Sequence, residues 1–481
     1  MGLETGRWGS RGALLMVLAL ASGSPGGGPA AVDAPQPPSL TFSLPPDQSP
    51  QAPWRDPILS AAFPWPLLLS PRLMRFDGGG RLAGDLAAAA STPDGGRTWL
   101  FRLRPERRLL DGSALTAQQF CRLWRRGGRM KAKRRSLSRA IFGDPVPGDQ
   151  ETVVFRLRSP SHLFPRLLAH PAFAVEGIEA EFCLQPARSR GTWTFIPSSP
   201  AAPGSLYSVV LQGQDQAIRA FGAGEVDAWP LSEAWMMTLP PPPEVERLCA
   251  RLPWTYALSF QPRGREALDR RLRQVFMGLI HRRHLVEGVA PATGRPLGAA
   301  AGLGGGVPGG ETPGDKAAGV DEARLRARSF RLLVDAGDLL AVALADQIQA
   351  DLVDQEIHLQ VEKVAGRRYE ARLRQGDYGT TVVGFRPYFH APALDLAVLL
   401  SSLGLEDARF RTALDDIMAT SSRRRRQRQT AAAEEQLRGR YLLVPLLQVD
   451  RCWAAGPGAA ALAGLLARID IHLVRRRAVS R

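Results

Sequence analysis

Apolar and polar residues alternate in two short segments of nearly identical sequence, TWLFRLR at residues 98–104 and TVVFRLR at 152–158. Alternation with a period of two is typical of β-strands, because successive side chains of a strand point to opposite faces. Apolar Leu100 interrupts the alternation in the first segment, but a strand remains the better interpretation. We therefore expect two similar strands that serve as scaffold and carry no site.

The sequence between these strands changes from a turn pattern to a helix pattern. LLDGS at 109–113 contains an Asp-Gly turn signal, and Thr116 is a favourable helix N-cap. Three apolar residues then fall on one helical face: Phe120, Leu123 and Trp124. Two strands that flank a short helical insertion predict a small domain.

A helical pattern and a glycine-rich stretch lie next to each other in the second half of the chain. Apolar residues at helical spacing predict an amphipathic helix over 269–289. The stretch 294–319 has low complexity and is expected to form a loop or linker.

The pattern that follows the linker changes from strand to helix and back to strand. FRLLVD at 330–335, an apolar helical segment at 339–353 and IHLQVEKV at 357–364 predict a strand–helix–strand unit with parallel strands. A further buried strand is expected at 380–384, after another helix.

Composition adds a strong basic bias to this α/β pattern. The chain has 481 residues, a formal charge of +16 and 44% hydrophobic residues, enough to bury large cores in two or three lobes. All but four of its 62 basic residues are arginines, which fits codon bias as well as phosphate binding. The densest basic clusters, 125–135 and 423–428, lack interleaved aromatic residues that would stack on bases. We therefore expect no nucleic-acid partner.

The N-terminal segment has the features of a secretory signal peptide. Arg7 and Arg11 precede the apolar run 13–21, and small residues follow near Ala30. This run is too short to span a bilayer. We expect cleavage between Ser22 and Ala34 and a soluble mature protein in the periplasm or elsewhere outside the cytoplasm.

The four cysteines are far apart in the sequence and form no metal-binding motif. They are Cys121, Cys183, Cys249 and Cys452. Disulfide bonds and buried free thiols are both consistent with an exported protein. None of the four follows the apolar run, so the lipid-anchoring cysteine of bacterial lipoproteins is not found there.

Several fragments occur in the order found in the family 5 extracytoplasmic solute-binding proteins, the receptors of peptide, nickel and related ABC importers. The first is GRLAGDLAAAASTPDGGRTWLFRLRPERRLLDGSALTAQQFCRLWRR, and the later ones are TVVFRLRSPSHLFPRLLAHPAF, AFGAGEVDAW, YALSFQP, LDRRLRQVFMGLIHRRHLVEGV, LADQIQADLVDQEIHLQVEKV, RLRQGDYGTTVVGF and LLVPLLQ. Each fragment is weakly specific, but eight in the same order are strong evidence. The chain thus resembles this family from about Ser70 to Gln448.

The resemblance implies an α/β, bilobal, type II periplasmic-binding-protein-like fold with an additional small α+β domain. The division it implies is a signal peptide at 1–31; lobe I from 32–70, 170–260 and 445–481; a small second domain at 71–169; and lobe III at 261–444. The strands that cross between the lobes are expected near 255–261 and 442–448.

The function implied by the resemblance is the binding of a solute without any catalysed reaction. Two hinged lobes close over a small solute or peptide, and an ABC transporter permease recognises the closed form. We expect a monomer without cofactor, bound metal or enzymatic activity. The alternative is a diverged receptor-fold protein that acts as a sensory or interaction module without transport.

The loop GFRPYFHAP at 384–392 departs from the family pattern. Peptide-binding relatives carry an Asp that pairs with the ligand's ammonium group, and Tyr388 stands at that position here. Arg386 offers a planar fork suited to carboxylate or phosphate. We hypothesise that Arg386, Tyr388 and His390 line the cleft and favour a peptide-like, anionic or polar ligand. A solvated surface loop is the alternative.

The remaining candidates have simpler structural explanations beside the functional one. Gln261 stands at the place of a family asparagine and either binds ligand or is a core amide. Trp54, Trp193 and Trp229 either line a cleft or pack in the core or on the surface. The family's first-lobe segment that should follow Phe195 is replaced by IPSSPAAPGS.

One pair of histidines is spaced like metal ligands. His281 and His284 are separated by two arginines, and no Glu or Asp lies within two residues of either histidine. A solvated helix face is therefore the favoured interpretation.

Overall fold

The computed structural model of the chain describes residues 39–44, 69–77, 80–126, 143–180, 182–186, 192–197, 206–212, 214–231, 246–250, 253–264, 266–297, 318–405, 408–456 and 473–475. All of them belong to one unit, Pro38–Arg481. The predicted signal peptide at 1–31 and Trp54 lie outside these residues.

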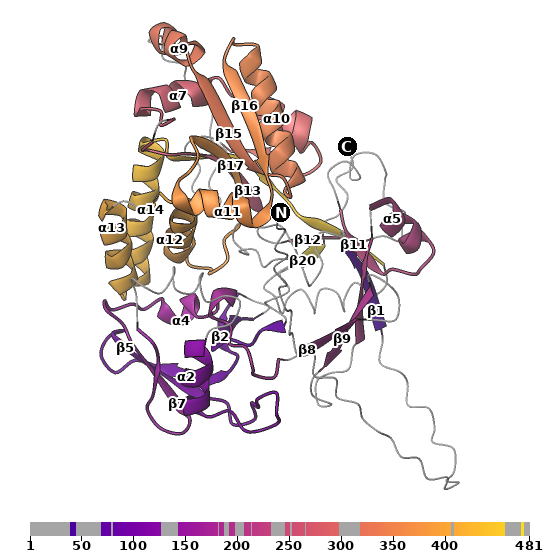
Figure 1. Cartoon of the computed structure of the whole chain (residues 1–481), viewed down its shortest axis with the longest axis vertical. Coiled ribbons are helices and arrows are strands. Elements are labelled where there is room, and N and C mark those ends of the chain that lie inside the picture. Colours follow the sequence, from indigo (N-terminus) through magenta and orange to yellow (C-terminus); the bar gives the residue numbers. More distant parts are fainter. Residues whose placement is uncertain are drawn as a thin grey trace, which may run out of the picture. The chain divides into compact units, whose positions relative to one another are not determined.

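The largest described region is built on a six-stranded mixed sheet (Figure 1). In spatial order its strands are β14 (Gly294–Pro296), β18 (Leu443–Val449), β13 (Trp254–Phe260), β17 (Thr380–Phe385), β15 (Ser329–Asp335) and β16 (His358–Val364). β15 runs parallel to β16 and β17, whereas β13 is antiparallel to β17 and β18. The predicted strand–helix–strand unit is confirmed, since α10 (Leu339–Val353) joins two parallel neighbours.

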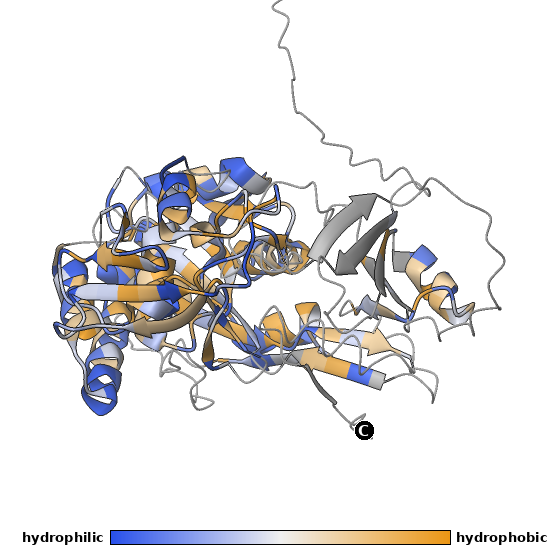
Figure 2. Cartoon of the chain, turned by 90° about the horizontal axis from the view of Figure 1, so that it is seen from below, coloured by the Kyte–Doolittle hydropathy of each residue, from blue (hydrophilic) through white to orange (hydrophobic). Residues whose placement is uncertain are grey.

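The central strands of this sheet are buried on both faces. Every residue of β13 and β17 is buried, which explains why they read as nearly continuous apolar runs. Leu344, Ile348 and Leu352 of α10 pack in the same core as β13. Figure 2 shows apolar stretches along the strands and hydrophilic residues on many of the helices.

This region contains eight described helices. They are α7 (Arg270–Gly278), α8 (Arg282–Val289), α9 (Ala318–Arg326), α10, α11 (Gly366–Gln375), α12 (Pro392–Ser402), α13 (Ala408–Ala419) and α14 (Arg423–Gly439). The side chains of Asp269, Asp338 and Ser422 cap α7, α10 and α14 by accepting backbone N–H groups.

Two local predictions in this region are wrong. The helix expected over 269–289 is two helices, because α7 ends at Gly278 and the chain turns before α8 begins. The start of the expected linker is strand β14, because its backbone pairs with β18. Pro296 is compatible with a strand there, since β14 is at the edge of the sheet.

A second sheet has eight strands, in the spatial order β20-β12-β19-β11-β1-β10-β9-β8. These are β20 (Leu473–Arg475), β12 (Glu246–Ala250), β19 (Cys452–Ala455), β11 (Ala228–Pro230), β1 (Ser39–Leu44), β10 (Leu206–Leu211), β9 (Thr192–Pro197) and β8 (Phe182–Pro186). Helix α5 (Gln214–Gly222) leads toward β11. β1 is parallel to β10.

The small domain contains the two similar strands as antiparallel neighbours. Its four-stranded sheet has the order β4 (Ala87–Ser91), β5 (Thr98–Leu103), β7 (Thr152–Arg156) and β6 (Val146–Pro147). The rings of Phe101 and Phe155, one from each repeat, meet edge to face with centroids 5.7 Å apart. The two segments are alike because both supply one face of the same core.

The predicted helix of the small domain is α2 (Ala117–Arg126), and its N-cap is confirmed. The Thr116 N–H donates to Gln119 Oε1 at 2.8 Å, and the Gln119 N–H donates to Thr116 Oγ1 at 3.3 Å. This reciprocal pair is a capping box. The domain also contains β2 (Met74–Phe76), β3 (Leu82–Gly84) and α4 (Phe164–Leu167), and a 3-10 turn at Pro171–Phe173 follows it.

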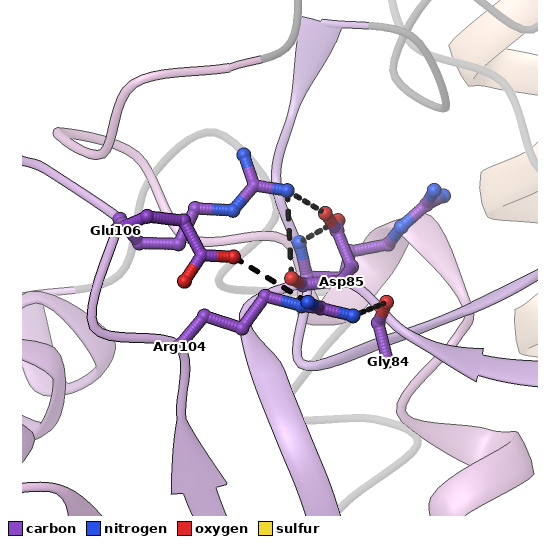
Figure 3. A network of polar contacts seen from close by, with 6 residues as sticks. Gly84, Asp85, Arg104 and Glu106 are labelled. Carbon is purple, nitrogen blue, oxygen red and sulfur yellow. Dashed lines mark hydrogen bonds and ion pairs between the residues drawn. The ribbon is translucent and has the colours of Figure 1, made fainter.

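Arginines of the small domain take part in a local polar network (Figure 3). Arg107 forms an ion pair with Asp85 at 2.8 Å, and Asp85 Oδ2 accepts a hydrogen bond from the backbone N–H of Arg72 at 2.9 Å. Arg104 donates to Glu106 and to the Gly84 carbonyl oxygen, both at 3.4 Å. These arginines therefore connect β3 to the chain after β5.

Candidate functional site

Several strand ends meet at one edge of the six-stranded sheet, which we call the crossing edge. The parallel strands β15, β16 and β17 end there. β13 begins there, because Thr255 pairs with Phe385, and β18 ends there, because Trp254 pairs with Val449. Ligands of open α/β sheets bind outside the carboxyl ends of such strands.

The chain also passes between the two large sheets at the crossing edge. It leaves the eight-stranded sheet at Ala250 and enters the six-stranded sheet at Trp254. It returns between Val449 and Cys452. The two connections are short, and they are next to each other because β13 pairs with β18 and β12 pairs with β19. This is the geometry expected of hinge segments.

A polar network occupies this edge. The Tyr256 hydroxyl donates to Asp338 Oδ2 at 3.1 Å, and Arg451 donates to the Tyr256 hydroxyl at 2.6 Å. Asp338 also accepts the Ala341 N–H at 3.1 Å, so it is held by the first turn of α10. Burial raises the pKa of the Tyr256 phenol, with a contribution from Asp338, so the hydroxyl stays neutral and donates.

A glycine makes this network possible. A Cβ at Gly384 would lie 2.7 Å from the Tyr256 ring and 3.2 Å from Asp338 Oδ2. A side chain at residue 384 would therefore displace the phenol from its partners.

Arg451 is the cation of the network. Its guanidinium lies 5.6 Å from the centre of the Trp254 ring and 3.9 Å from Asp338, and its side chain is 36% exposed. The preceding residue, Asp450, forms an ion pair with Arg295 at 2.8 Å. A guanidinium that is partly exposed and backed by an aromatic ring suits a carboxylate or another polar group of a ligand.

The loop after β17 contains the three residues predicted to line the cleft. Arg386 is 8% exposed, and its guanidinium lies 6.0 Å from the centre of the Tyr388 ring. Tyr388 is 2% exposed and donates its hydroxyl to the Ala169 carbonyl oxygen of the small domain at 3.0 Å. The structure therefore shows Tyr388 as a contact with the small domain, a role that the sequence did not suggest.

His390 makes a contact with the same domain. Its ring lies 5.2 Å from that of Phe76, centroid to centroid, and it has a positive φ of 49°. Arg166 donates to the Phe389 carbonyl oxygen at 2.9 Å. The loop is thus fixed from the small-domain side by both ring packing and hydrogen bonds.

Asp395 fixes the same loop from the side of α12. Its Oδ1 accepts the N–H groups of Tyr388 at 2.6 Å and Phe389 at 2.9 Å. The residue keeps some exposure, but its Oδ2 is buried. Burial raises the pKa of this carboxyl to about 6, although the two N–H donors act in the opposite direction.

The other predicted site residues lie elsewhere. Gln261 is 4% exposed and donates to the Leu403 carbonyl oxygen at 3.1 Å, as expected of a core amide. Trp229 is buried, with its ring 4.3 Å from that of Phe221. Trp193 lies on β9 opposite Val209, but its side chain is outside the described residues.

Sequence reasoning missed Tyr256, Asp338 and Arg451. Tyr256 lies within the segment expected to cross between the lobes, and an aspartate directly before an apolar helix is an N-cap signal. Their proximity depends on the strand order, which neither signal contains.

Two cysteines are also brought together beside this edge. Cys249 of β12 and Cys452 of β19 form a disulfide bond, and Cys121 is a buried free thiol. The side chain of Cys183 is outside the described residues. The sequence left open whether the cysteines form disulfide bonds or remain free thiols, and the structure contains both.

Comparison with solved structures identifies the architecture. AgaA, a periplasmic binding protein from A. tumefaciens R10 in complex with agropinic acid, matches with a TM-score of 0.69 and 17% identity over 92% of this chain and 99% of that chain. DppA from Helicobacter pylori, in complex with the peptide STSA, matches with a TM-score of 0.70 and 13% identity over 87% of this chain and 94% of that chain. The chain has the fold of a periplasmic binding protein.

A third solved structure supports the same fold. NikA from Brucella suis, in complex with Fe(III)-EDTA, matches with a TM-score of 0.66 and 16% identity over 87% of this chain and 95% of that chain. The predicted α/β, bilobal binding-protein fold is confirmed. No protein-family model and no curated protein matches the sequence. In the described part of this binding-protein fold, no helix is long and apolar enough to cross a membrane.

Proposed function

We propose that this chain is an extracytoplasmic solute-binding receptor of the family 5 ABC importers. It captures a small peptide-like, anionic or polar solute between two hinged lobes and delivers it to a permease, as a monomer and without catalysis. The proposal is supported by the ordered sequence fragments together with a fold shared with proteins whose structures contain a peptide, agropinic acid or a metal chelate.

One observation carries the proposal. Both connections between the large sheets lie at the crossing edge, next to the polar network of Tyr256, Asp338 and Arg451. A ligand that contacts groups on both sides of such connections favours the closed form by its difference in affinity for the two forms. The mixed charges of the network suit a ligand that has both donors and acceptors.

The division of the chain follows from the same proposal. The signal peptide covers 1–31, and the small domain covers 71–169. The predicted lobe boundaries at 260/261 and 444/445 need a correction, because β13 and β18 lie within the six-stranded sheet. Lobe I therefore comprises 32–70, 170 to about 253 and about 450–481, and lobe III lies between these last two segments. Export through the signal peptide places the mature protein in the periplasm or elsewhere outside the cytoplasm, where a disulfide bond persists.

The ligand-binding residues in this proposal are Arg451 and Arg386. The first is partly exposed at the crossing edge, and the second begins the loop at the carboxyl end of β17. Tyr388 and His390 hold that loop in place, so they act on the ligand through Arg386.

The test begins with native mass spectrometry of small molecules carried through purification. The identified compound, together with a panel containing short peptides and agropinic acid, is then titrated into the protein by calorimetry. Arg451→Ala and Arg386→Ala should each weaken binding at least about tenfold, as expected for loss of a charge-assisted hydrogen bond. Arg428→Ala, which removes an exposed arginine of α14, is the matched control.

Small-angle scattering adds a conformational readout. Saturation with the ligand should reduce the radius of gyration, because the lobes close. Unchanged affinity in both arginine variants would remove the proposed site. An unchanged scattering profile at saturation would remove the hinged-receptor function.

A further inference from the structure

Two histidines and an aspartate that are far apart in the sequence meet between helices α8 and α10. His281 and His284 lie at the start of α8, and Asp351 lies in the last turn of α10. Their candidate ligand atoms all lie within 4.8 Å of one another. The carboxylate that lies closest to the two histidines in this cluster is thus supplied by a different helix.

The aspartate has an unusual hydrogen-bonding state. Asp351 is 8% exposed, and its Oδ1 accepts a hydrogen bond from Gln347 Nε2 at 3.0 Å. Its Oδ2 is buried without a hydrogen-bond partner. A buried carboxylate oxygen that lacks a partner is costly, and either a bound cation or a water molecule would satisfy it. Gln347 meanwhile fixes the carboxylate in the way that an outer-shell partner fixes a metal ligand.

The two histidines are suited to complete the site. Both are exposed, and their ring centroids lie 4.9 Å apart. Metal–ligand bonds of about 2 Å require ligand atoms no more than about 4 Å apart, so a small rotation of the exposed imidazoles closes the set. Solvent access to both rings also provides an entry path for the ion.

The two arginines between the histidines interact with residues outside the proposed site. Arg283 forms an ion pair with Glu287 at 2.8 Å. Arg282 is partly buried and interacts with Tyr441, and burial lowers its pKa. Their positive charge weakens the attraction of the site for a cation, so binding should depend on all three ligands.

We propose that His281, His284 and Asp351 bind one divalent transition-metal ion, with Zn²⁺ as the best match. Two imidazoles and one carboxylate form a three-ligand set that leaves a position for water, which suits Zn²⁺. Mg²⁺ and Ca²⁺ prefer all-oxygen sets and are excluded by the same chemistry. The ion joins α8 to α10 and is distinct from the proposed solute site.

The test uses the full mature protein, treated with EDTA and dialysed, and titrated with ZnCl₂ by calorimetry. We expect one saturable Zn²⁺ site per chain, no heat from MgCl₂, and a higher melting temperature with Zn²⁺. His284→Gln and Asp351→Asn should each weaken Zn²⁺ binding more than about tenfold, and Gln347→Ala should weaken it about tenfold. His358→Gln removes an exposed histidine of β16 and should leave binding unchanged.

The controls separate the outcomes. Circular dichroism and metal-free melting temperatures show whether each variant folds. Because His284 is exposed, His284→Gln should fold normally, so it tests the Zn²⁺ site even if Asp351→Asn does not fold. Absence of saturable Zn²⁺ binding, or full binding by folded His284→Gln, would overturn the proposal. Either result leaves the solute-receptor function untouched, because solute binding is measured separately.

Discussion

Cys249 and Cys452 form a disulfide bond between the strand that precedes the first connection between the two large sheets and the strand that follows the second. The two residues face each other in the register of β12 and β19, although 203 residues separate them. The disulfide therefore ties both hinge connections together at their base in the eight-stranded sheet.

Removal of this disulfide should lower stability. Because the bond restricts the unfolded chain, the double variant Cys249→Ala/Cys452→Ala should lose about 2–4 kcal/mol of unfolding free energy. Chemical denaturation measures the loss, and peptide mapping without reductant should recover the linked pair. A reductant should lower the stability of the original chain but not that of the double variant. Equal sensitivity of both proteins would contradict the assignment.

Gly80 should tolerate no side chain. It has a φ of +69°, and a Cβ there would lie 2.6 Å from the His390 ring. Gly80→Ala should therefore cost about 1–2 kcal/mol for the backbone and a further 1–3 kcal/mol for the clash. Gly112→Ala is the matched control, since its φ is +83° but nothing lies within 4 Å of its Cβ. Denaturant titration compares the two.

A second variant isolates the clash at Gly80. In a His390→Ala background, the cost of Gly80→Ala should fall to that of Gly112→Ala, because only the backbone cost remains. An undiminished cost would show that the His390 ring is not the obstacle.

The carboxyl of Asp395 should make stability depend on pH. Its pKa is raised to about 6 in the folded state, above the unfolded value, so the folded chain binds the proton more tightly. Its stabilising effect is complete below about pH 4 and is lost as the pH rises through 6. Between pH 7 and pH 4, the original chain should gain on the order of 1–3 kcal/mol relative to Asp395→Asn.

The comparison with Asp395→Asn removes the contribution of other groups. Asn keeps an oxygen that can accept the Tyr388 and Phe389 N–H groups, so the loop is retained. Unfolding free energies at several pH values provide the measurement. Parallel pH profiles for the two proteins would show that Asp395 does not titrate in this range.

Loss of the Tyr256 hydroxyl should weaken the crossing edge. Tyr256→Phe removes a donor to Asp338 and an acceptor for Arg451 without changing the ring. We expect a loss of about 1–3 kcal/mol of unfolding free energy, together with weaker solute binding. Tyr388→Phe is a comparison variant whose lost hydrogen bond lies at the small domain. It should lower stability with a smaller effect on solute affinity.

The sequence by itself determined the local elements of this protein. Alternating residues predicted β5 and β7, Thr116 was predicted as the N-cap of a helix, and β15, α10 and β16 were predicted in order. These features depend on side chains a few residues apart, whose spacing is visible in one dimension. The same local reasoning erred over 269–289 and at β14, where chain reversal and strand pairing override local preference.

Only the tertiary structure decided which distant residues meet. Asp351 lies near the two histidines because α8 packs against α10. Tyr388 is buried against the small domain, where its hydroxyl donates to the Ala169 carbonyl oxygen. Cys249 pairs with Cys452 because β12 and β19 are neighbours. Strand order and helix packing arise from the joint burial of apolar surface over the whole chain, and local spacing carries no record of them.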